Sequence, residues 1–424
     1  MLDINFVRKQ PDLVRAGMEK RGIDASPVDQ VLDLDSRRRK LLVEVETLKG
    51  ERNKISKEVG RTKDDKERET KIAASRGYGE KIKDLDATLR KVDNELRAVM
   101  AIIPNITFEE VPAGGEDDNI VVREVGSKPA FDFQAKPHWD LGPELGIIDF
   151  ERGVKMSGSR FYVLSGAGAR LQRALIAWML DLHIRQGYLE KYTPFIVREE
   201  TVFGAGQLPK FKDNLYKDHE EDLYLIPTAE VPLTGLHMDE ILEEASLPRH
   251  YTAYSPSFRR EKMSAGRDVR GIKRGHQFDK VEMYKYCRPE NSNKEFDKMV
   301  ADAEQTCQEL GLPYRVLLKA AGDTSEAAHI SYDIEVWAAG CDEWLEVSSI
   351  SNVGEYQARR ANIRYKPEGG GANLPVHTLN GSGLGLPRTM IAVIENNQRE
   401  DGSVVVPEVL LPWMGGLRVI SKEN

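Results

Sequence analysis

The residues best suited to chemistry lie in one stretch, Phe258–Tyr286, where basic side chains are concentrated. The stretch holds nine Lys/Arg against four Asp/Glu, whereas the whole chain has a formal net charge of −8. Strand-like runs at its two ends, separated by Gly266, Gly271 and Gly275, predict a β-hairpin with a long loop. The local positive charge favours an anionic ligand, although a solvated, charge-rich hairpin explains the composition equally well.

Alternation along the two strands groups these side chains further. Side chains two residues apart share one face of a strand. Arg259 and Glu261 are therefore predicted to lie together on the first strand, and Phe278, Lys280 and Glu282 on the second. The combined face would offer an arginine for a phosphate, an aromatic ring for a base, and carboxylates for a cation or an ammonium group.

Two shorter segments could add groups for a small substrate and a metal ion. Thr228 and Glu230 lie two residues apart between prolines, so a hydroxyl and a carboxylate could meet an ammonium group. An ordinary loop with a helix cap is the commoner explanation of that pattern. Glu346 stands in an apolar run, LEVSSISN. A buried carboxylate needs a partner, and Mg²⁺ with nucleotide phosphates would suit it.

A glycine-rich segment, Gly381–Gly383, precedes a helical pattern near the end of the sequence. We expect a loop whose backbone approaches a ligand closely. Pro387 suits the first helical turn, and Arg388 stands at the helix start, where the helix dipole also favours an anion. Taken alone, a glycine-rich turn before a helix is weak evidence for a binding site.

The N-terminal quarter of the chain carries two heptad seams. In the first, apolar residues recur every seven positions at Leu34, Leu41, Leu48 and Ile55. The second runs without polar interruption from Ile82 to Ile103, and Pro104 ends it. Together they predict an antiparallel coiled-coil hairpin over about 28–103, with a polar tip over Arg61–Gly79. Such an arm could be a dimerisation rod, a lever or a ligand-binding finger.

The rest of the chain predicts an antiparallel α+β domain, because many strand-like runs and few helical ones occur without strand–helix–strand alternation. At 424 residues the chain exceeds the usual size of one domain. We expect an N-terminal helical domain over 1–104, a linker rich in Pro, Gly and acids over 105–135, and a second domain over 136–424.

Composition narrows the cellular setting. The chain shows no apolar run long enough to span a bilayer, and its N-terminus lacks the apolar core of a secretion signal. Three dispersed cysteines, Cys287, Cys307 and Cys341, suit a reducing compartment, and neither they nor the eight histidines have a zinc-binding spacing. We therefore expect a cytoplasmic protein without a membrane contact or a zinc site.

In their order, these motifs resemble the bacterial-type seryl-tRNA synthetases, a family of class II aminoacyl-tRNA synthetases. The resemblance covers nearly the whole chain, from the coiled-coil arm to the last helix. It rests on the motifs SGSRFYVL, GQLPKF, TAEVPLT, FRRE followed by SAGRDVRG and HQFDKVE, YDIEVW, EVSS, QARR and LNGSGL.

The resemblance implies a catalytic domain built on an antiparallel β-sheet flanked by helices, in a homodimer with Pro194 at the interface. It also implies serine–tRNA ligase activity, in which L-serine and ATP give seryl-adenylate and pyrophosphate. Serine then passes to the 3′ end of tRNA(Ser) and, where it exists, tRNA(Sec). The coiled-coil arm would grip the tRNA, which is read there by shape and backbone.

Roles follow for the residues that match the family's motifs. Arg259 and Arg388 would be the catalytic cations at the phosphates. L-Serine would be bound by Thr228, Ala229, Glu230, Glu282 and Ser382. ATP would be bound by Arg259, Arg260, Glu261, Phe278, Glu346, Val347, Ser348, Ser349 and Arg388. Mg²⁺ would accompany ATP on Glu346 and Ser349.

Some assignments stay open at this stage. Arg260 stands where many relatives carry a small residue, so its contact with ATP is in doubt. Which of Glu230 and Glu282 takes the serine ammonium group is undecided. The loop Lys262–Arg274 is expected to face the acceptor end of the tRNA.

Alternative functions come from the same class and from outside it. A synthetase for threonine or proline shares the motifs but usually carries a C-terminal anticodon domain. A ligase for a carrier protein would lack the long arm. A non-catalytic paralogue could use the coiled coil as a scaffold, but the presence of Arg259, Glu346 and Arg388 together disfavours it.

Overall fold

The computed structural model describes residues 1–262 and 269–422, in two compact units. One unit holds Leu2–Glu19 and Ile23–Pro104, and the other begins at Asn105 and also includes Met1 and Lys20–Gly22. The division after Pro104 coincides with the end of the predicted N-terminal domain. No helix within the described ranges is both long and apolar enough to cross a membrane.

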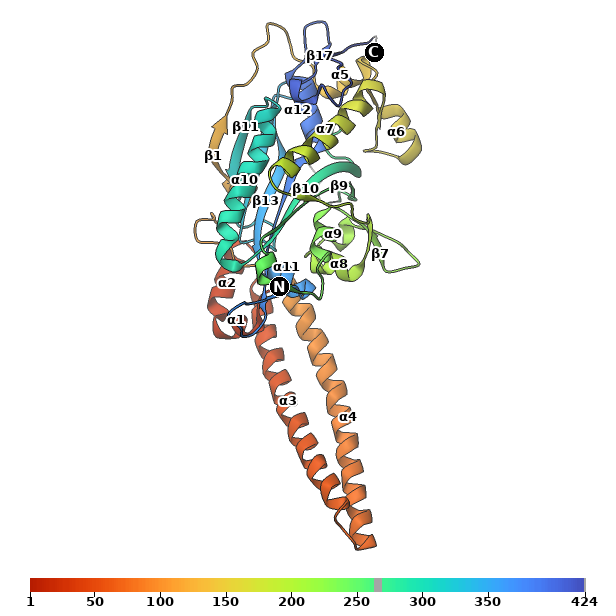
Figure 1. Cartoon of the computed structure of the whole chain (residues 1–424), viewed down its shortest axis with the longest axis vertical. Helices are drawn as coiled ribbons and strands as arrows, with labels where there is room; N and C mark the ends of the chain where they lie inside the picture. The colour runs from red at the N-terminus through yellow and green to blue at the C-terminus, as the bar shows by residue number, and fades with distance from the viewer. Residues whose placement is uncertain (263–268, 423–424) are drawn as a thin grey trace. The chain divides into compact units, whose positions relative to one another are not determined.

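The N-terminal unit is helical. Its elements are α1 (Ile4–Lys9), α2 (Pro11–Lys20), α3 (Ser26–Val59) and α4 (Asp65–Ile102). Figure 1 shows α3 and α4 side by side as a long antiparallel hairpin. Val31, Leu34 and Val45 of α3 and Val92 and Leu96 of α4 are buried, so the predicted heptad seams do form the contact between the arms.

The second arm is longer than the heptad pattern predicted. α4 begins directly after its N-cap Asp64 and continues through Gly77 and Gly79, so most of the predicted polar tip over Arg61–Gly79 is helix. Polar contacts hold this part to α3, as in the 3.6 Å ion pair of Lys71 with Glu58. Apolar periodicity is not required where a helix end is largely solvated and paired by polar groups.

The second unit is built on an eight-stranded sheet in the order β1-β11-β12-β13-β16-β10-β9-β4. All neighbours are antiparallel except β4 and β9, which confirms the predicted fold class. The strands are β1 (Ile120–Val125), β11 (Tyr314–Leu318), β12 (Ile330–Ala338), β13 (Glu343–Gly354), β16 (His377–Gly385), β10 (Gln277–Cys287), β9 (Arg249–Phe258) and β4 (Leu189–Glu190). The segment expected as a linker therefore contributes β1 to the sheet edge.

Helices cover both faces of this sheet (Figure 1). The first face packs against α7 (Gly166–Arg185), α10 (Ser292–Glu309) and α12 (Leu386–Asn396), and the second against α9 (Glu230–Gly235) and α11 (Tyr356–Ala361). The smaller elements are α5 (His138–Glu144), α6 (Phe150–Ser157), α8 (Glu199–Gly204), β2 (Ile148–Asp149), β3 (Val163–Leu164), β5 (Ile196–Arg198), β6 (Tyr216–Lys217), β7 (Leu223–Leu225), β8 (Ile241–Glu243), β14 (Arg364–Lys366), β15 (Leu374–Pro375), β17 (Val404–Val405) and β18 (Val419–Ile420).

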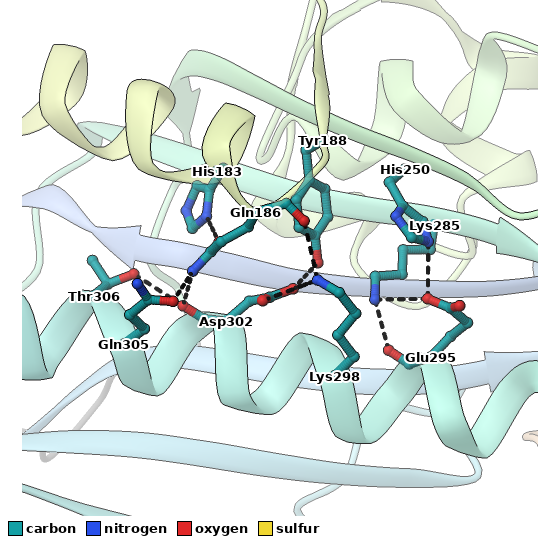
Figure 2. Close-up of polar contacts among 10 residues, drawn as sticks. All are labelled: His183, Gln186, Tyr188, His250, Lys285, Glu295, Lys298, Asp302, Gln305 and Thr306. Carbon is teal, nitrogen blue, oxygen red and sulfur yellow. Dashed lines mark hydrogen bonds and ion pairs between the residues drawn. The ribbon is translucent and has the colours of Figure 1, made fainter.

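A polar network lies between the first face of the sheet and α10 (Figure 2). The ammonium group of Lys285, which is fully buried, donates to the carboxylate and the carbonyl of Glu295 at 2.9 and 2.8 Å. The hydroxyl of Tyr188 donates to Asp302 at 2.8 Å. Buried charges need such partners, and these contacts fix α10 on the back of β10. The residues that alternate with Lys285 along β10 face the other way, towards the site described next.

Candidate active site

A cavity of about 360 Å³ opens on the second face of the sheet, at the hairpin of β9 and β10. Most of the residues singled out in the sequence meet here, although they come from five separate segments. The cavity is lined, among others, by Thr228, Glu230, Arg259, Glu261, Phe278, Glu282, Glu346, Val347, Ser349, Ser382 and Arg388.

The hairpin confirms one half of the alternation argument and corrects the other. Phe278, Lys280 and Glu282 all line the cavity from β10, as alternation predicts. The first strand, however, ends at Phe258, and Glu261 has a φ of 51°. Arg259 and Glu261 both reach the cavity because the chain turns after the strand, so strand alternation was the wrong reason for grouping them.

A β-bulge in β13 brings Glu346 and Ser349 to the same face. In a regular strand, residues three apart point to opposite faces. Here Glu346 pairs with Glu335 and Ser348 with Ile334, so that Val347 is the extra residue. The bulge reverses the alternation, and both side chains line the cavity.

A second irregularity shapes the end of the cavity that contains Glu282. Glu282 on β10 pairs with Ser382 on β16, while Val281 pairs with Leu384, so Gly383 is the extra residue. The segment Gly381–Gly383 is thus an internal strand, and the predicted glycine loop is wrong. A Cβ atom at 383 would overlap the imidazole of His183, which explains glycine at this position.

The polar end of the cavity holds two carboxylates with different partners. The hydroxyl of Thr228 donates to Glu282 Oε2 at 3.1 Å, and Lys280 forms an ion pair with the same carboxylate. Glu230 Oε1 accepts from the amides of Gln357 at 2.6 Å and Asn380 at 3.0 Å. Such a lining suits a small ligand that carries an ammonium group and a hydroxyl.

The carboxyl group of Glu230 has a pKa close to neutral pH. Burial raises the pKa of Glu230 to about 7, and the negative charge of Glu282 adds to the rise. The positive charges of Lys280 and Arg259 and the hydrogen bond from Gln357 oppose it. A cationic ligand group would tip this carboxyl to its ionised form.

The opposite end of the cavity is cationic. Arg388, in the first turn of α12, donates to the carbonyl oxygen of Glu346 at 2.8 Å and lies 3.4 Å from its carboxylate. Burial acts to raise the pKa of Glu346, but the charges of Arg388, Lys319, Arg259 and Arg274 outweigh it and hold the pKa below its ordinary value. An ionised carboxylate among four cations suits phosphates with their counter-ion.

Carboxylate and hydroxyl oxygens are ligands that Mg²⁺ accepts. Glu346 is held in its ionised form, and Ser349 lines the same wall of the cavity. The donor set therefore fits a magnesium ion that accompanies nucleotide phosphates.

Arg259 and Phe278 form a pair at the mouth of the hairpin. The Arg259 guanidinium carbon lies 5.0 Å from the centroid of the Phe278 ring, and its Nε donates to the carbonyl of Pro227 at 3.2 Å. The carbonyl contact fixes the arginine, and its remaining N–H donors are available to a phosphate.

Three residues of the implied binding sets lie outside the cavity lining. Ala229 is fully buried in the apolar core beside α9. Arg260 donates to the carbonyl of Leu215 at 2.9 Å, and its guanidinium stacks on Tyr216. The hydroxyl of Ser348 donates to the carbonyl of Ser382 at 2.5 Å, which ties β13 to β16.

Other residues of the site escaped the sequence reasoning. Lys273 and Arg274 line the cavity from the hairpin loop, and Asn380 lines it from β16. Lys273 forms an ion pair with Glu343. The basic run around 270–274 and the asparagine beside the glycine segment were visible signals, but nothing local indicated which of these side chains would turn inward.

A buried cluster anchors the loop that carries these cations. His138 Nδ1 donates to Glu395 at 2.7 Å, while its Nε2 accepts from the backbone N–H of Ile272 at 3.1 Å. The thiol of Cys341 donates to Glu395 at 3.1 Å. Both nitrogens of His138 are thus engaged within the protein, and the cluster joins the loop to α12.

The hairpin loop Lys262–Arg274 was expected to contact the acceptor end of a tRNA. Its segment 263–268 lies outside the described residues.

Comparison with known proteins identifies the family. A model of the seryl-tRNA synthetase N-terminal domain matches residues 1–107, and one of the class II tRNA synthetase core domain (G, H, P, S and T) matches residues 210–397. The chain is 60% identical over 423 residues to a serine–tRNA ligase of Roseiflexus sp. (strain RS-1), covering 100% of both. The chain belongs to the seryl-tRNA synthetase family.

Further relatives extend this seryl-tRNA synthetase assignment. A serine–tRNA ligase of Chloroflexus aurantiacus is 56% identical over 421 residues, with 99% of this chain and 100% of the relative covered. The crystal structure of the Pyrococcus horikoshii seryl-tRNA synthetase complexed with ATP superimposes with a TM-score of 0.93 at 38% identity, covering 99% of each chain. The predicted family, fold class and serine–tRNA ligase activity are confirmed.

Proposed function

We propose that this cavity activates L-serine with ATP and then delivers the seryl group to the 3′ end of tRNA(Ser). The observation that supports the proposal is that the two ends of the cavity differ in charge. An acidic, hydroxyl-lined end with Thr228, Glu230 and Glu282 adjoins a cationic end with Arg259 and Arg388. These two ends match the two reactants of adenylate formation, an amino acid and a polyphosphate.

The cationic end would stabilise the reaction without a protein nucleophile. A carboxylate oxygen of serine attacks the α-phosphorus of ATP, the bond to the bridging oxygen breaks, and pyrophosphate leaves. Negative charge is then shared among the phosphate oxygens, and Arg259 and Arg388, which line the cavity, would stabilise it. Mg²⁺, held on Glu346 and Ser349 when bound, would supply further neutralisation of this charge. Phe278 would support the adenine ring.

Transfer to tRNA then needs a hydroxyl of the terminal ribose. This oxygen attacks the carbonyl carbon of seryl-adenylate, its proton is lost, and AMP leaves with the bonding electrons. The arginines that held the phosphates in the first step would hold the phosphate of the departing AMP in the second.

Selection of serine would follow from the acidic end. Carboxylates that bind the serine hydroxyl are left without a partner when alanine enters, which costs more binding energy than the lost contact alone. Threonine would be excluded by the volume of its methyl group. This end of the cavity contains two carboxylates, and a synthetase for a small apolar amino acid would have no use for both.

We also propose that the protein acts as a homodimer. Leu189 on β4, Ile196 on β5 and Tyr192 between them expose 57, 55 and 85% of their surface. They flank the exposed Pro194 in sequence, and β4 is an edge strand of the eight-stranded sheet. An apolar sheet edge of this kind is normally covered, and a second copy of the chain is the occupant that its family membership supports.

Paired variants test the homodimer. Replacing both Leu189 and Tyr192 by Glu should give a monomer in sedimentation velocity. The matched control is Val121→Glu on β1, an exposed apolar residue at the other edge of the sheet, which should stay dimeric. A double variant that sediments as the wild type would contradict the proposed interface.

The partners of the arm form the third part of the proposal. The antiparallel hairpin of α3 and α4 offers basic residues along solvated helices, which suits the phosphate backbone of a tRNA. tRNA(Ser) is the proposed substrate, and charging of tRNA(Sec) stays a prediction of the resemblance. The cytoplasmic location likewise stays a prediction, which cell fractionation would test.

The test of the activity is ATP–pyrophosphate exchange with each of the twenty amino acids. We expect exchange with serine alone. Exchange that ran as well with threonine would overturn the assignment of the acidic end, and no exchange with any amino acid would favour the alternative of a non-catalytic scaffold.

A further inference from the structure

Gln357 is a fully buried side chain on α11 that lies behind the serine end of the cavity without lining it. It belongs to the motif QARR, to which no substrate contact is assigned above. Its amide has four polar neighbours, and each comes from a different element or loop of the fold.

The chemistry of these neighbours fixes the amide in one orientation. On one side, Nε2 lies 3.0 Å from the carbonyl oxygen of Ala205, which can only accept, and 2.6 Å from Glu230 Oε1, which also accepts from the amide of Asn380. On the other side, Oε1 accepts from the hydroxyls of Tyr284 at 2.9 Å and Thr378 at 2.7 Å. A flipped amide would place its oxygen against two acceptors, which is unfavourable.

This orientation determines the state of the Glu230 carboxylate. Its Oε1 accepts from two amide N–H groups, those of Gln357 and Asn380. An oxygen that accepts two such bonds cannot also carry the carboxyl proton, so any proton on Glu230 resides on Oε2. A ligand that enters the cavity therefore contacts Oε2 of Glu230, while Oε1 remains hydrogen-bonded to the amides of Gln357 and Asn380.

We propose that Gln357 is a positioning residue that holds Oε1 of Glu230 and presents Oε2 to the substrate, which sets the affinity for serine. The proposal rests on the proposed role of Glu230 in binding serine. Tyr284 and Thr378 support it by holding the amide oxygen. Because Gln357 contacts no residue of the cationic end in these hydrogen bonds, its effect is confined to the amino acid half of the reaction.

The charged surroundings of Glu230 define what Gln357 adds. Glu282 and the positive groups of Lys280 and Arg259 act on the carboxylate from β10 and from the segment after β9. Among the neutral groups, the amide of Gln357 favours the ionised carboxylate through its N–H donor. Removing that donor should make Glu230 harder to ionise.

The main experiment is steady-state ATP–pyrophosphate exchange with Gln357→Met in the full-length protein, at varied serine, ATP and pH. Methionine keeps the length of the side chain and removes the donor. We expect the KM for serine to rise by about tenfold or more, as for a lost hydrogen bond to a charged group, while the KM for ATP is unchanged. The acid limb of kcat/KM for serine should move to higher pH.

Gln357→Glu sharpens the test because it keeps the acceptor for Tyr284 and Thr378 but turns a carboxyl oxygen towards Glu230. It should raise the serine KM further and shift the acid limb further than Gln357→Met. Tyr284→Phe, which leaves the contact between Gln357 and Glu230 in place, should raise the serine KM less. If Gln357→Met fails to fold, Tyr284→Phe serves as the test variant. An unchanged serine KM in Tyr284→Phe would then overturn the proposal.

The matched control is Gln186→Met, which removes a glutamine amide from the network in Figure 2. That amide donates to the carbonyl of Asp302 and the side chain of Gln305, each at 3.0 Å, on the other face of the sheet. The control should leave the serine KM and the acid limb unchanged. Equal effects of Gln186→Met and Gln357→Met, or a Gln357→Met variant whose KM values for serine and ATP rise together, would reduce Gln357 to a structural role.

Glu230→Gln separates this inference from the proposed function. If the wild-type protein shows no serine-dependent exchange, the proposed function is wrong, and the inference about Gln357 is wrong as well. If exchange occurs but Glu230→Gln leaves the serine KM unchanged, the activity stands and the positioning role of Gln357 is overturned.

Discussion

Arg259 and Arg260 are adjacent residues with different surroundings. Arg259 lines the cavity beside Phe278, whereas Arg260 is engaged by the Leu215 carbonyl and the Tyr216 ring. The matching family motif implies an ATP contact for both. Of the two, Arg259 lines the cavity and Arg260 does not, so the two residues form a natural pair of variants.

We predict that Arg259→Ala lowers serine-dependent ATP–pyrophosphate exchange by at least about a hundredfold, because a preorganised donor at the developing phosphate charge is lost. Arg260→Ala should retain most of the exchange activity. Comparable loss in both variants would show that Arg260 reaches ATP after all, and retention in both would remove Arg259 from the catalytic set.

We predict that Glu230 makes the binding of serine depend on pH. Its pKa of about 7 in the folded protein lies above the ordinary value of 4.5, so part of this carboxyl is protonated at neutral pH. A raised carboxyl pKa means that folding favours the neutral form. The stability that the neutral form contributes is therefore complete below about pH 4.5 and is lost as the pH rises towards 7.

Binding of a serine ammonium group beside this carboxyl should reverse the preference and release protons near pH 6.5 to 7.5. Isothermal titration calorimetry in buffers of different ionisation enthalpy would measure the release. Glu230→Gln should abolish it. Proton uptake on serine binding would contradict the expected coupling.

At the scale of elements, the hairpin loop and α12 are joined in two places. Arg388 of α12 donates from Nε to the carbonyl of Lys273 in the loop at 3.4 Å, and His138 bridges the two elements. His138 bonds to Glu395 of α12 and to the backbone of Ile272 in the loop. The same loop carries Lys273 and Arg274, and the same helix carries Arg388. The side chains at the cationic end of the cavity are thus placed by two elements that contact each other and that buried His138 joins.

Gly271 is the point at which this anchor tolerates no side chain. Its φ is 68°, and a Cβ atom there would overlap Nε2 of His138. We predict that Gly271→Ala lowers the free energy of unfolding by on the order of 1–2 kcal/mol from backbone strain alone. It should raise the KM for ATP more than that for serine, because the cations of the loop move. Gly311→Ala, which has the same φ of 68° and open space around it, is the matched control for strain without overlap.

At the scale of the whole molecule, the arm and the catalytic unit are separate structures with separate cores. Two contacts fix the register of the arm, the 2.6 Å ion pair of Arg38 with Asp93 and the 3.4 Å contact between Ser56 and Ser75. The same register sets Val45 opposite Asp86. A truncation that removes the residues between these two keeps the base of the arm, where most of its buried residues lie.

We predict that replacing residues 46–85 by a short glycine-rich turn leaves serine-dependent exchange within about twofold of the wild type, because the removed residues belong to the other compact unit. Charging of tRNA(Ser) should fall steeply, since the arm is the proposed tRNA contact. Aminoacylation assays on the same preparation would measure both effects. Unimpaired charging would remove the tRNA from the proposed role of the arm.

Local sequence patterns were sufficient to predict the arm, the hairpin and the family. Heptads predicted the arm, alternation and glycine placement predicted the hairpin, and ordered motifs identified the family. Helix propensity, capping and side-chain alternation act over a few residues, so they can be read without knowing the rest of the chain. Phe278, Lys280 and Glu282 were grouped correctly for this reason.

Features that depend on residues distant in sequence became visible only in the folded chain. The bulges at Val347 and Gly383 turn Glu346, Ser349 and Ser382 into the cavity, and each bulge is defined by the register of a partner strand. The same holds for Gln357, whose four neighbours are spread over more than 170 residues of sequence. Strand register and buried hydrogen bonding are settled by packing across the sheet, so no local pattern could have placed these groups.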